Sequence, residues 1–267
     1  MFESAQSLAR PTAPTRPHSL EVAAVAATPV KPAAIIVVIP TYNERENLPI
    51  CVARVLALDP AYRVIVVDDN SPDGTGAVAD ELVRTHCGRV EVIHRVKKAG
   101  LGPAYIAGLR EALAAEPELI GMMDADLSHD AADLARLVDA AMTGADLALG
   151  SRYIAGGGTR GWPLFRRLLS RFGGRYAATV LGMAIADPTS GFKVFRRATL
   201  ATVDLDTICS DGYAFNIEIT YRAVRRGGRL VEVPIVFTDR VAGASKLSRR
   251  IMVEAMVVVW RLRFGRS

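Results

Sequence analysis

Cysteine is scarce in this chain, and it has no long apolar run. The three cysteines, Cys51, Cys87 and Cys209, show neither metal-ligand spacing nor a pairing pattern. We therefore expect neither a disulfide framework nor a zinc site. Such cysteine usage is typical of a protein in a reducing compartment. The longest candidate for a membrane span, residues 251–260, has ten residues and contains Glu254. Because about 20 apolar residues are needed to cross a bilayer, a membrane-spanning chain is not predicted.

Acidic residues are missing from one segment of the chain and nearly missing from another. Residues 159–186 hold five arginines and no acid, and residues 240–267 hold seven Lys or Arg and one acid. In the first segment the arginines alternate with large apolar side chains. A solvated basic face is the simplest explanation of such charge, but this mixture suits anionic lipid headgroups and phosphates better. We therefore expect a membrane surface as partner, and not nucleic acid.

Composition divides the chain into three regions. Residues 1–33 contain five prolines among Ala, Thr and Ser. Such a segment buries too little apolar surface to offset the entropy of ordering, so we expect a disordered N-terminal arm and no signal peptide. Residues 34–247 are expected to form one domain. Residues 248–267 are predicted to be a basic, amphipathic C-terminal segment.

Short apolar runs alternate with amphipathic segments along the domain. Strands are expected at residues 35–39, 64–67, 90–93, 119–123 and 147–149, and helices at 46–58, 75–84, 103–115 and 131–142. Further along, helices are expected at 164–183 and 212–226, and a strand at 229–236. This order predicts an α/β protein with an open, mostly parallel sheet and helices on both faces. Ligands of such sheets bind beyond the carboxyl ends of the strands.

The fourth expected strand ends in two carboxylates, Asp124 and Asp126. Side chains two residues apart on an extended segment point the same way, so the two acids can converge on one point. Mg²⁺ or Mn²⁺ suits that point, because such ions combine one or two carboxylates with phosphate oxygens and water. Ser128 could contribute to the same shell. The alternative is a turn that is merely solvated.

Other strand ends carry polar side chains at the same expected edge. Asp69, after the second strand, can accept hydrogen bonds from a nucleobase or ribose. Pro40, Tyr42 and Glu44, after the first strand, would form a second wall around the nucleoside. Five such strand ends on one edge are difficult to explain as independent loops. We therefore expect a single nucleotide and metal-diphosphate site there.

Two downstream segments could complete this site. Asp187, in a compact polar turn, is a candidate carboxylate on the acceptor side, or alternatively initiates a turn before Pro188. Arg240 and Lys246 flank a loop that contains glycine, which could close over the nucleotide as a lid or be a basic surface loop.

Together these segments resemble the family 2 glycosyltransferases of the dolichol-phosphate or polyprenol-phosphate mannosyltransferase type. The matching segments, in family order, are residues 40–44, 68–75, 100–102, 123–129, 151–153, 187–193, 212–215 with Glu218, and Arg240 with 245–246. The resemblance implies a GT-A fold for the domain and a nucleotide-diphosphate mannose donor, typically GDP-mannose. It also implies Mg²⁺ or Mn²⁺, a polyprenyl monophosphate acceptor, and a peripheral position at the cytoplasmic face of a membrane.

The resemblance also assigns roles to residues. The nucleoside would be held by Pro40, Tyr42, Glu44, Val67 and Asp69. The metal, diphosphate and sugar would be held by Asp124, Ala125 and Asp126, with Arg152, Arg240 and Lys246 on phosphate oxygens. The lipid phosphate would meet Arg166, Arg167 or Arg171. Asp126, Arg152 and Asp187 would carry the catalysis. Ser128 stands where the family often has glutamine and is a poorer metal ligand.

Three alternatives remain open at this point. The donor could be a UDP-sugar, such as glucose or an N-acetylhexosamine, with undecaprenyl phosphate as acceptor. A non-catalytic nucleotide- or lipid-binding module would be marked by loss of the Asp pair, but both acids are present. A nucleotidyltransferase usually carries a phosphate loop rich in Gly and Lys near its first strand, which this sequence lacks.

Overall fold

The structure is a computed structural model that describes Met1, residues 34–239 and residues 249–265, with the side chains of 249–255 excepted. Nearly all of the expected N-terminal arm at 1–33 therefore lies outside the described residues. The same is true of Arg240 and Lys246 in the expected lid. The following account concerns the compact unit that contains the described residues from 34 onward.

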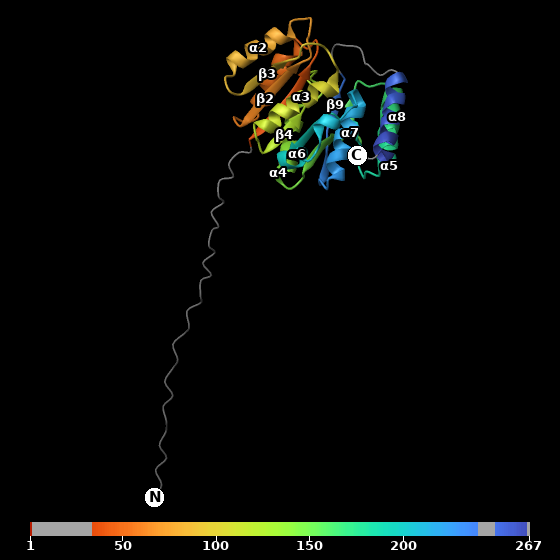
Figure 1. The fold of residues 1–267 in the computed structure, drawn as a ribbon. Helices are drawn as coiled ribbons and strands as arrows, with labels where there is room; N and C mark the ends of the chain where they lie inside the picture. Colours follow the sequence, from red (N-terminus) through yellow and green to blue (C-terminus); the bar gives the residue numbers. More distant parts are fainter. Residues whose placement is uncertain (2–33, 240–248, 266–267) are drawn as a thin grey trace. The chain divides into compact units, whose positions relative to one another are not determined.

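A sheet of seven strands forms the centre of the described unit, in the order β3-β2-β1-β4-β7-β5-β8 (Figure 1). Its strands are β1 (Ile35–Thr41), β2 (Tyr62–Asp68), β3 (Val90–His94), β4 (Leu119–Met122), β5 (Leu147–Ser151), β7 (Lys193–Arg196) and β8 (Leu230–Pro234). Strands β1 to β4 are parallel where they pair, and so are β5 and β8. The predicted open, mostly parallel sheet is confirmed, and the ends of β1, β2 and β4 share one edge.

Strand β7 is the main departure from the expected order. It lies between the two parallel groups and runs antiparallel to both β4 and β5. Only four residues long and bounded by Lys193 and Arg196, it gives almost no periodic signal. The expected strand at 229–236 is divided as well: β8 ends at Pro234, and β9 (Val236–Thr238) pairs with β6 (Gly158–Arg160) in a separate two-stranded sheet.

Helices cover both faces of the sheet, as predicted. One face packs on α1 (Asn47–Leu56), α2 (Thr75–Thr85) and α4 (Ala131–Met142). The other packs on α3 (Leu101–Ala114), α6 (Arg197–Ala201), the short 3₁₀ helix η1 (Leu205–Thr207) and α7 (Gly212–Arg225). Alternation along β1 explains this division, because Val37 and Ile39 join the first core whereas Ile36 and Val38 join the second.

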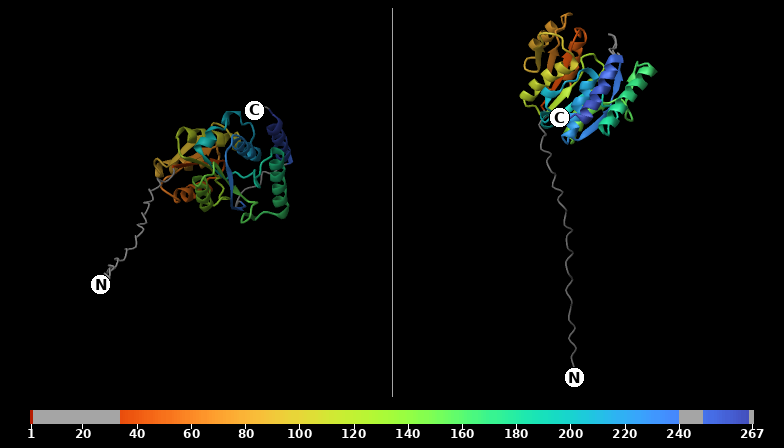
Figure 2. Two further views of the ribbon diagram at one scale, coloured as in Figure 1. Left: turned by 90° about the horizontal axis from the view of Figure 1, so that it is seen from below. Right: turned by 45° about the vertical axis from the view of Figure 1, so that its right-hand side comes forward.

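Two further helices, α5 (Leu164–Leu181) and α8 (Arg249–Phe264), lie side by side on the outer side of α7 (Figure 2). Leu181 of α5 and Val259 of α8 pack with Tyr221 of α7 in a third apolar cluster. The Trp260 indole N–H also donates to the Tyr176 hydroxyl at 2.6 Å. Among the described residues, no helix combines the length and the apolar character that crossing a bilayer requires.

Candidate active site

Asp124 and Asp126 lie in a tight turn directly after β4. Leu127 adopts φ +62°, a left-handed conformation that costs free energy for a side chain of this kind. The turn allows the Ser128 N–H to donate to Asp126 Oδ1 at 3.1 Å. The Thr238 N–H of β9 donates to the Ser128 carbonyl at 3.2 Å and holds the turn from outside. These two hydrogen bonds, one of them from the second sheet, hold the turn that carries both acids in its strained conformation.

The side chain of Asp124 is oriented from α3. The Tyr105 hydroxyl donates to Asp124 Oδ1 at 2.9 Å, and Tyr105 is fully buried with its ring stacked on Phe215. Burial, and then the charge of Asp124, raise the pKa of Tyr105 well above its usual value. The phenol therefore remains protonated and acts as a hydrogen-bond donor. The backbone N–H of Asp124 also donates to His129 Nδ1, with 3.5 Å between the two nitrogen atoms.

The oxygen atoms of this turn fit a divalent metal ion. The side chains of Asp124 and Asp126 line an open cavity of about 150 Å³. The Ser128 hydroxyl is buried and has no hydrogen-bond partner among the described residues. Those residues offer no group of three or more His, Cys, Asp or Glu side chains for a metal. Because Mg²⁺ is commonly held by one or two carboxylates plus substrate phosphates, two acids and a hydroxyl suffice.

The same cavity gathers most of the residues predicted to hold the nucleotide-sugar. Its lining includes Pro40, Tyr42, Glu44, Asp69, Asp124, Ala125 and Asp126. Val67 differs, because its side chain is fully buried and packs in the core against α3. The predicted nucleoside residues other than Val67 and the two predicted metal carboxylates thus line one cavity, whereas Ser128, the third predicted metal residue, is buried beside it and does not line it.

Asp69 has a second role that the sequence did not indicate. Its carboxylate accepts hydrogen bonds from Arg95 Nη1 at 2.6 Å and from the backbone N–H groups of Ala99 and Gly100 at 3.0 Å. It therefore fixes the loop that forms the opposite wall of the cavity. On that loop, Lys98 Nζ lies 3.4 Å from the centre of the Tyr42 ring, a cation–π contact.

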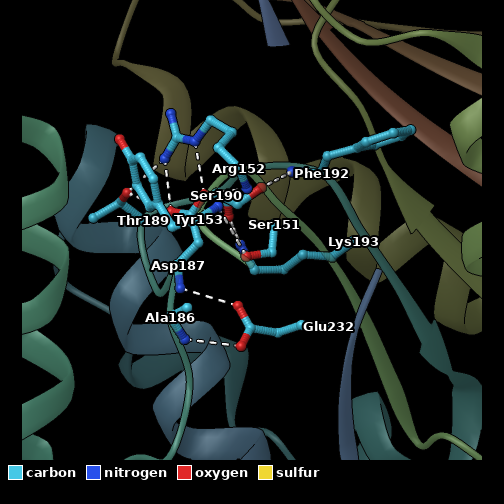
Figure 3. A network of polar contacts seen from close by, with 10 residues as sticks. All are labelled: Ser151, Arg152, Tyr153, Ala186, Asp187, Thr189, Ser190, Phe192, Lys193 and Glu232. Atoms are coloured by element: carbon cyan, nitrogen blue, oxygen red, sulfur yellow. Dashed lines mark hydrogen bonds and ion pairs between the residues drawn. The ribbon is translucent and has the colours of Figure 1, made fainter. Parts of the chain in front are cut away.

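Arg152, just beyond β5, forms a buried ion pair with Asp187 (Figure 3). Arg152 Nε and Nη2 each donate to the carboxylate at 2.7 Å, and Nη2 also donates to Thr189 Oγ1 at 2.8 Å. Burial alone would raise the pKa of Asp187, but the guanidinium and its hydrogen bonds hold that pKa below its ordinary value. Asp187 is therefore a permanent anion that orients Arg152, and it is poorly suited to accept a proton.

Lys193, at the start of β7, is fully buried beneath this ion pair (Figure 3). Its ammonium donates to the Ser190 carbonyl and, at 3.2 Å, to Asn216 Oδ1 of α7. Burial lowers the pKa of Lys193 to about 7, although Asp187 and Asp124 counteract this effect.

An aromatic cluster connects the Asp turn with Arg152 and Arg166. His129 stacks on Phe192 at 4.5 Å and meets the edge of Phe237, which contacts Trp162 at 5.3 Å. The guanidinium carbons of Arg152 and Arg166 lie 5.4 and 4.2 Å from the centre of the Trp162 ring. Two cations therefore share one indole ring, on the far side of the cluster from the Asp turn.

The three arginines predicted to meet the lipid phosphate do not act alike in the structure. Arg166 forms an ion pair with Asp239 at 3.0 Å. Arg167 is exposed on α5. Arg171 lines a separate cavity of about 420 Å³ together with Arg175 and Tyr153. Of the three, only Arg166 is connected with Arg152 through Trp162.

Comparison with known proteins places this site in a family. The family model described as Glycosyl transferase family 2 matches residues 36–203. The chain is a family 2 glycosyltransferase. Among curated proteins it is 49% identical over 230 residues to a polyprenol monophosphomannose synthase of Mycolicibacterium smegmatis, covering 85% of this chain and 87% of that protein. It is 45% identical over 227 residues to an undecaprenyl-phosphate mannosyltransferase of Micrococcus luteus, covering 85% and 93%.

Solved structures agree with the fold of this glycosyltransferase. A glucosyl-3-phosphoglycerate synthase from Mycobacterium tuberculosis, in complex with phosphoglyceric acid, superposes with a TM-score of 0.64 at 18% identity, covering 88% of this chain and 82% of that one. The same enzyme with Mn²⁺, UDP and glucosyl-3-phosphoglycerate gives a TM-score of 0.62. These similarities show the GT-A fold, and the predicted fold class is confirmed.

Sequence reasoning assigned no role to five residues that the structure places in or beside the glycosyltransferase site: Tyr105, Lys98, Lys193, Trp162 and Phe237. Tyr105 lies within an amphipathic segment where nothing distinguishes it from a core residue. Lys193 ends the matching segment 187–193, but the sequence does not reveal that its side chain is buried. Trp162 gave a partial signal, since a buried tryptophan among arginines is an attractive platform for cations. Its connection with the Asp turn depends on β6 and β9, whose pairing was not predicted.

Proposed function

We propose that this glycosyltransferase transfers mannose from GDP-mannose to a polyprenyl monophosphate, with Mg²⁺ or Mn²⁺, and yields polyprenyl phosphate mannose and GDP. The relatives named as mannosyltransferases of polyprenol and undecaprenyl phosphate support the sugar and the acceptor class. The observation that carries the proposal is the aromatic cluster. It connects the carboxylates suited to the donor's metal with two guanidiniums, of Arg152 and Arg166, suited to a second phosphate.

The donor would bind in the cavity at the edge of the sheet. Tyr42 and the loop of Lys98 flank the position proposed for the nucleoside, and Asp124 and Asp126 face the diphosphate and its metal. When bound, a divalent ion stabilises the charge that develops on a leaving diphosphate. Ser128 is proposed as a third oxygen ligand, because its buried hydroxyl has no hydrogen-bond partner in the described part of the chain. Arg240 and Lys246, which lie outside the described residues, are proposed to meet phosphate oxygens.

The acceptor would attack without a protein base. A phosphate monoester has a second pKa near ~6, so it is already an anion at neutral pH, whereas a sugar hydroxyl would need to lose a proton. A bond forms between an acceptor phosphate oxygen and the anomeric carbon, while the bond from that carbon to the donor diphosphate breaks and GDP leaves. This single in-line displacement inverts the configuration. Arg152 and Arg166 would align the incoming phosphate, with Asp187 fixing Arg152.

A membrane surface is the proposed location of the acceptor. Large apolar side chains that are 44–76% exposed lie on α5 and α8: Leu164, Phe165, Leu168, Phe172, Met256, Val257, Trp260 and Phe264. Exposed arginines accompany them on the same helices: Arg167, Arg171, Arg175, Arg261 and Arg263. Apolar and basic side chains mixed in this way suit the headgroup layer of an anionic bilayer. We propose that these two helices lie on the cytoplasmic face of a membrane.

Competition between donors tests this proposal. The purified protein would be incubated with Mg²⁺, a polyprenyl phosphate and equal amounts of GDP-mannose, UDP-N-acetylglucosamine and UDP-glucose with a ¹³C-labelled sugar. The label gives the otherwise isomeric mannosyl and glucosyl lipids different masses, so mass spectrometry distinguishes all three products. Mannosyl phosphopolyprenol as the dominant product is the expected result. A glucosyl or N-acetylhexosaminyl lipid, formed faster from a UDP donor, would favour the alternative donor class. Binding of nucleotide without any lipid product would favour a regulatory module.

A further inference from the structure

Lys193 is a buried charge for which the fold itself provides no evident reason. It is fully buried on β7, where it pairs with Met122 of β4 on one side and Leu149 of β5 on the other. It therefore lies between the strand that leads to Asp124 and the strand that leads to Arg152. Burying an ammonium group is unfavourable unless it is well paired, and an apolar side chain is the usual occupant of a central strand.

The hydrogen bonds of Lys193 connect two separate elements. Its ammonium donates to the Ser190 carbonyl in the turn that follows Asp187, and to Asn216 Oδ1 on α7 at 3.2 Å. Both acceptors are neutral, and Asn216 is itself buried. Lys193 thus fastens the turn that contains Asp187 and Thr189 to α7. That turn also holds the Arg152 guanidinium.

The fastened turn also lies close to Asp124. A Cβ added to Gly191 would lie 3.3 Å from Asn216 Nδ2 and 3.7 Å from Asp124 Oδ2. Little space therefore separates the turn, α7 and the Asp124 carboxylate. A displacement of the turn would move Asp124 on one side and Arg152 on the other, which are the groups assigned to the donor metal and to the acceptor phosphate.

We propose that Lys193 is a positioning residue that keeps the Asp124 carboxylate and the Arg152 guanidinium in register, by holding the turn at residues 187–191 against α7. This role rests on the proposed function. Lys193 touches neither donor nor acceptor, and it acts through Ser190 and Asn216. Its loss should reduce turnover more than donor binding, because most walls of the donor cavity belong to other elements, the ends of β1 and β2 and the start of α3, and only the turn at 124–126 adjoins the displaced segment.

A double-mutant cycle of Lys193→Met and Asn216→Ala tests the proposal in the full-length enzyme. Kinetics would be measured with GDP-mannose and polyprenyl phosphate, and melting temperatures in parallel. Lys193→Met is expected to lower kcat by about 100-fold, the usual effect of misplacing reacting groups by about 1 Å. The KM for the donor should stay within about twofold, since binding of the donor to the cavity walls is unchanged. The double variant should be no slower than Lys193→Met, because both changes break one connection.

Thr220→Val is the matched control. It removes a buried hydroxyl one turn further along α7, whose hydrogen bond goes to the helix's own carbonyl at residue 216. It should lower the melting temperature and leave kcat unchanged. The proposal is overturned if Lys193→Met retains the kcat of the wild type. It is also overturned if kcat falls in proportion to the melting temperature in all variants, including Thr220→Val. If Lys193→Met does not fold, a wild-type kcat in Asn216→Ala also overturns it. An inactive wild type would instead contradict the proposed function.

Discussion

The two sides of the glycosyltransferase site are built in different ways. On the proposed donor side, two acidic side chains are held by neighbours: Asp124 by Tyr105, and Asp69 by Arg95 and the 99–100 backbone. On the acceptor side, beyond the buried Arg152–Asp187 pair, α5 and α8 present exposed aromatic and basic side chains. The residues proposed for the donor are thus preorganised by contacts within the protein, whereas the proposed acceptor side would be completed by a membrane surface.

The largest expected effect is on the donor side. Asp126→Asn should lower kcat at least about 1000-fold, roughly 4 kcal/mol of barrier, because it removes a charge that faces the metal-diphosphate. Asp130→Asn is the matched control, since Asp130 caps α4 through Ala132 and asparagine caps equally well. Initial rates with GDP-mannose at saturating Mg²⁺ would measure both. Activity retained in Asp126→Asn would exclude the role in metal binding.

At the boundary between the two sides, Asp187→Asn should destabilise the protein by about 3 kcal/mol, because it leaves the Arg152 charge buried without its partner. The melting temperature should fall by about 10 °C. Asp206→Asn, which breaks an exposed ion pair with Arg110, should cost under about 1 kcal/mol. Differential scanning calorimetry would compare them. A folded Asp187→Asn enzyme with normal affinities and no turnover would instead mark Asp187 as a base.

Stability should also depend on pH through Lys193. In the folded protein its pKa is about 7, against an ordinary value of 10.5. Between these values the unfolded chain holds a proton that the folded chain has released, so raising the pH favours folding. The free energy of unfolding of the wild type relative to Lys193→Met should rise by up to about 1.4 kcal/mol per pH unit from pH 7 to 10, and stay flat below pH 7. Urea titrations in metal-free buffer would measure it, and a flat difference above pH 7 would contradict a desolvated ammonium.

The smallest effect is expected on the exposed face of α5. Replacing Phe165 and Phe172 by serine should weaken binding to anionic vesicles about tenfold, because less apolar surface enters the headgroup layer. Vesicle flotation would measure the binding. The activity of this double variant on a short-chain, water-soluble polyprenyl phosphate should equal that of the wild type. Val96→Ser, at an exposed apolar residue of the loop after β3, is the control and should bind as the wild type does. Equal flotation of all variants would exclude α5 from the membrane contact.

Most of the donor side could be predicted from the sequence, because its residues follow strand ends in regular order. Because β1, β2 and β4 are parallel, the polar residues that follow them must lie at the same edge of the sheet. Asp69, Asp124 and Asp126 do line one cavity there. The predicted role of Val67 fits less well, since its side chain packs in the core. Val67 lies within β2, two residues before Asp69, and a residue inside a central strand is often buried in the core. A motif match alone does not reveal this burial.

The acceptor side was less predictable, because it depends on contacts between segments far apart in the chain. The antiparallel insertion of β7 brings Lys193 between β4 and β5, and the β6–β9 pair brings Phe237 to His129 and Trp162. Neither element has a periodic pattern long enough to be recognised. The arginine series on α5 was predicted as one phosphate site, but the structure separates its members, and only Arg166 reaches Trp162.

The central claim is that the second substrate is a lipid phosphate that needs no protein base. The most direct measurement compares polyprenyl phosphate with the corresponding polyprenol, both in vesicles with GDP-mannose and Mg²⁺, by mass spectrometry of the lipids and quantification of released GDP. The account predicts mannosyl phosphopolyprenol and an equal amount of GDP from the phosphate, and no product from the alcohol. Transfer to the polyprenol hydroxyl at a comparable rate would contradict it.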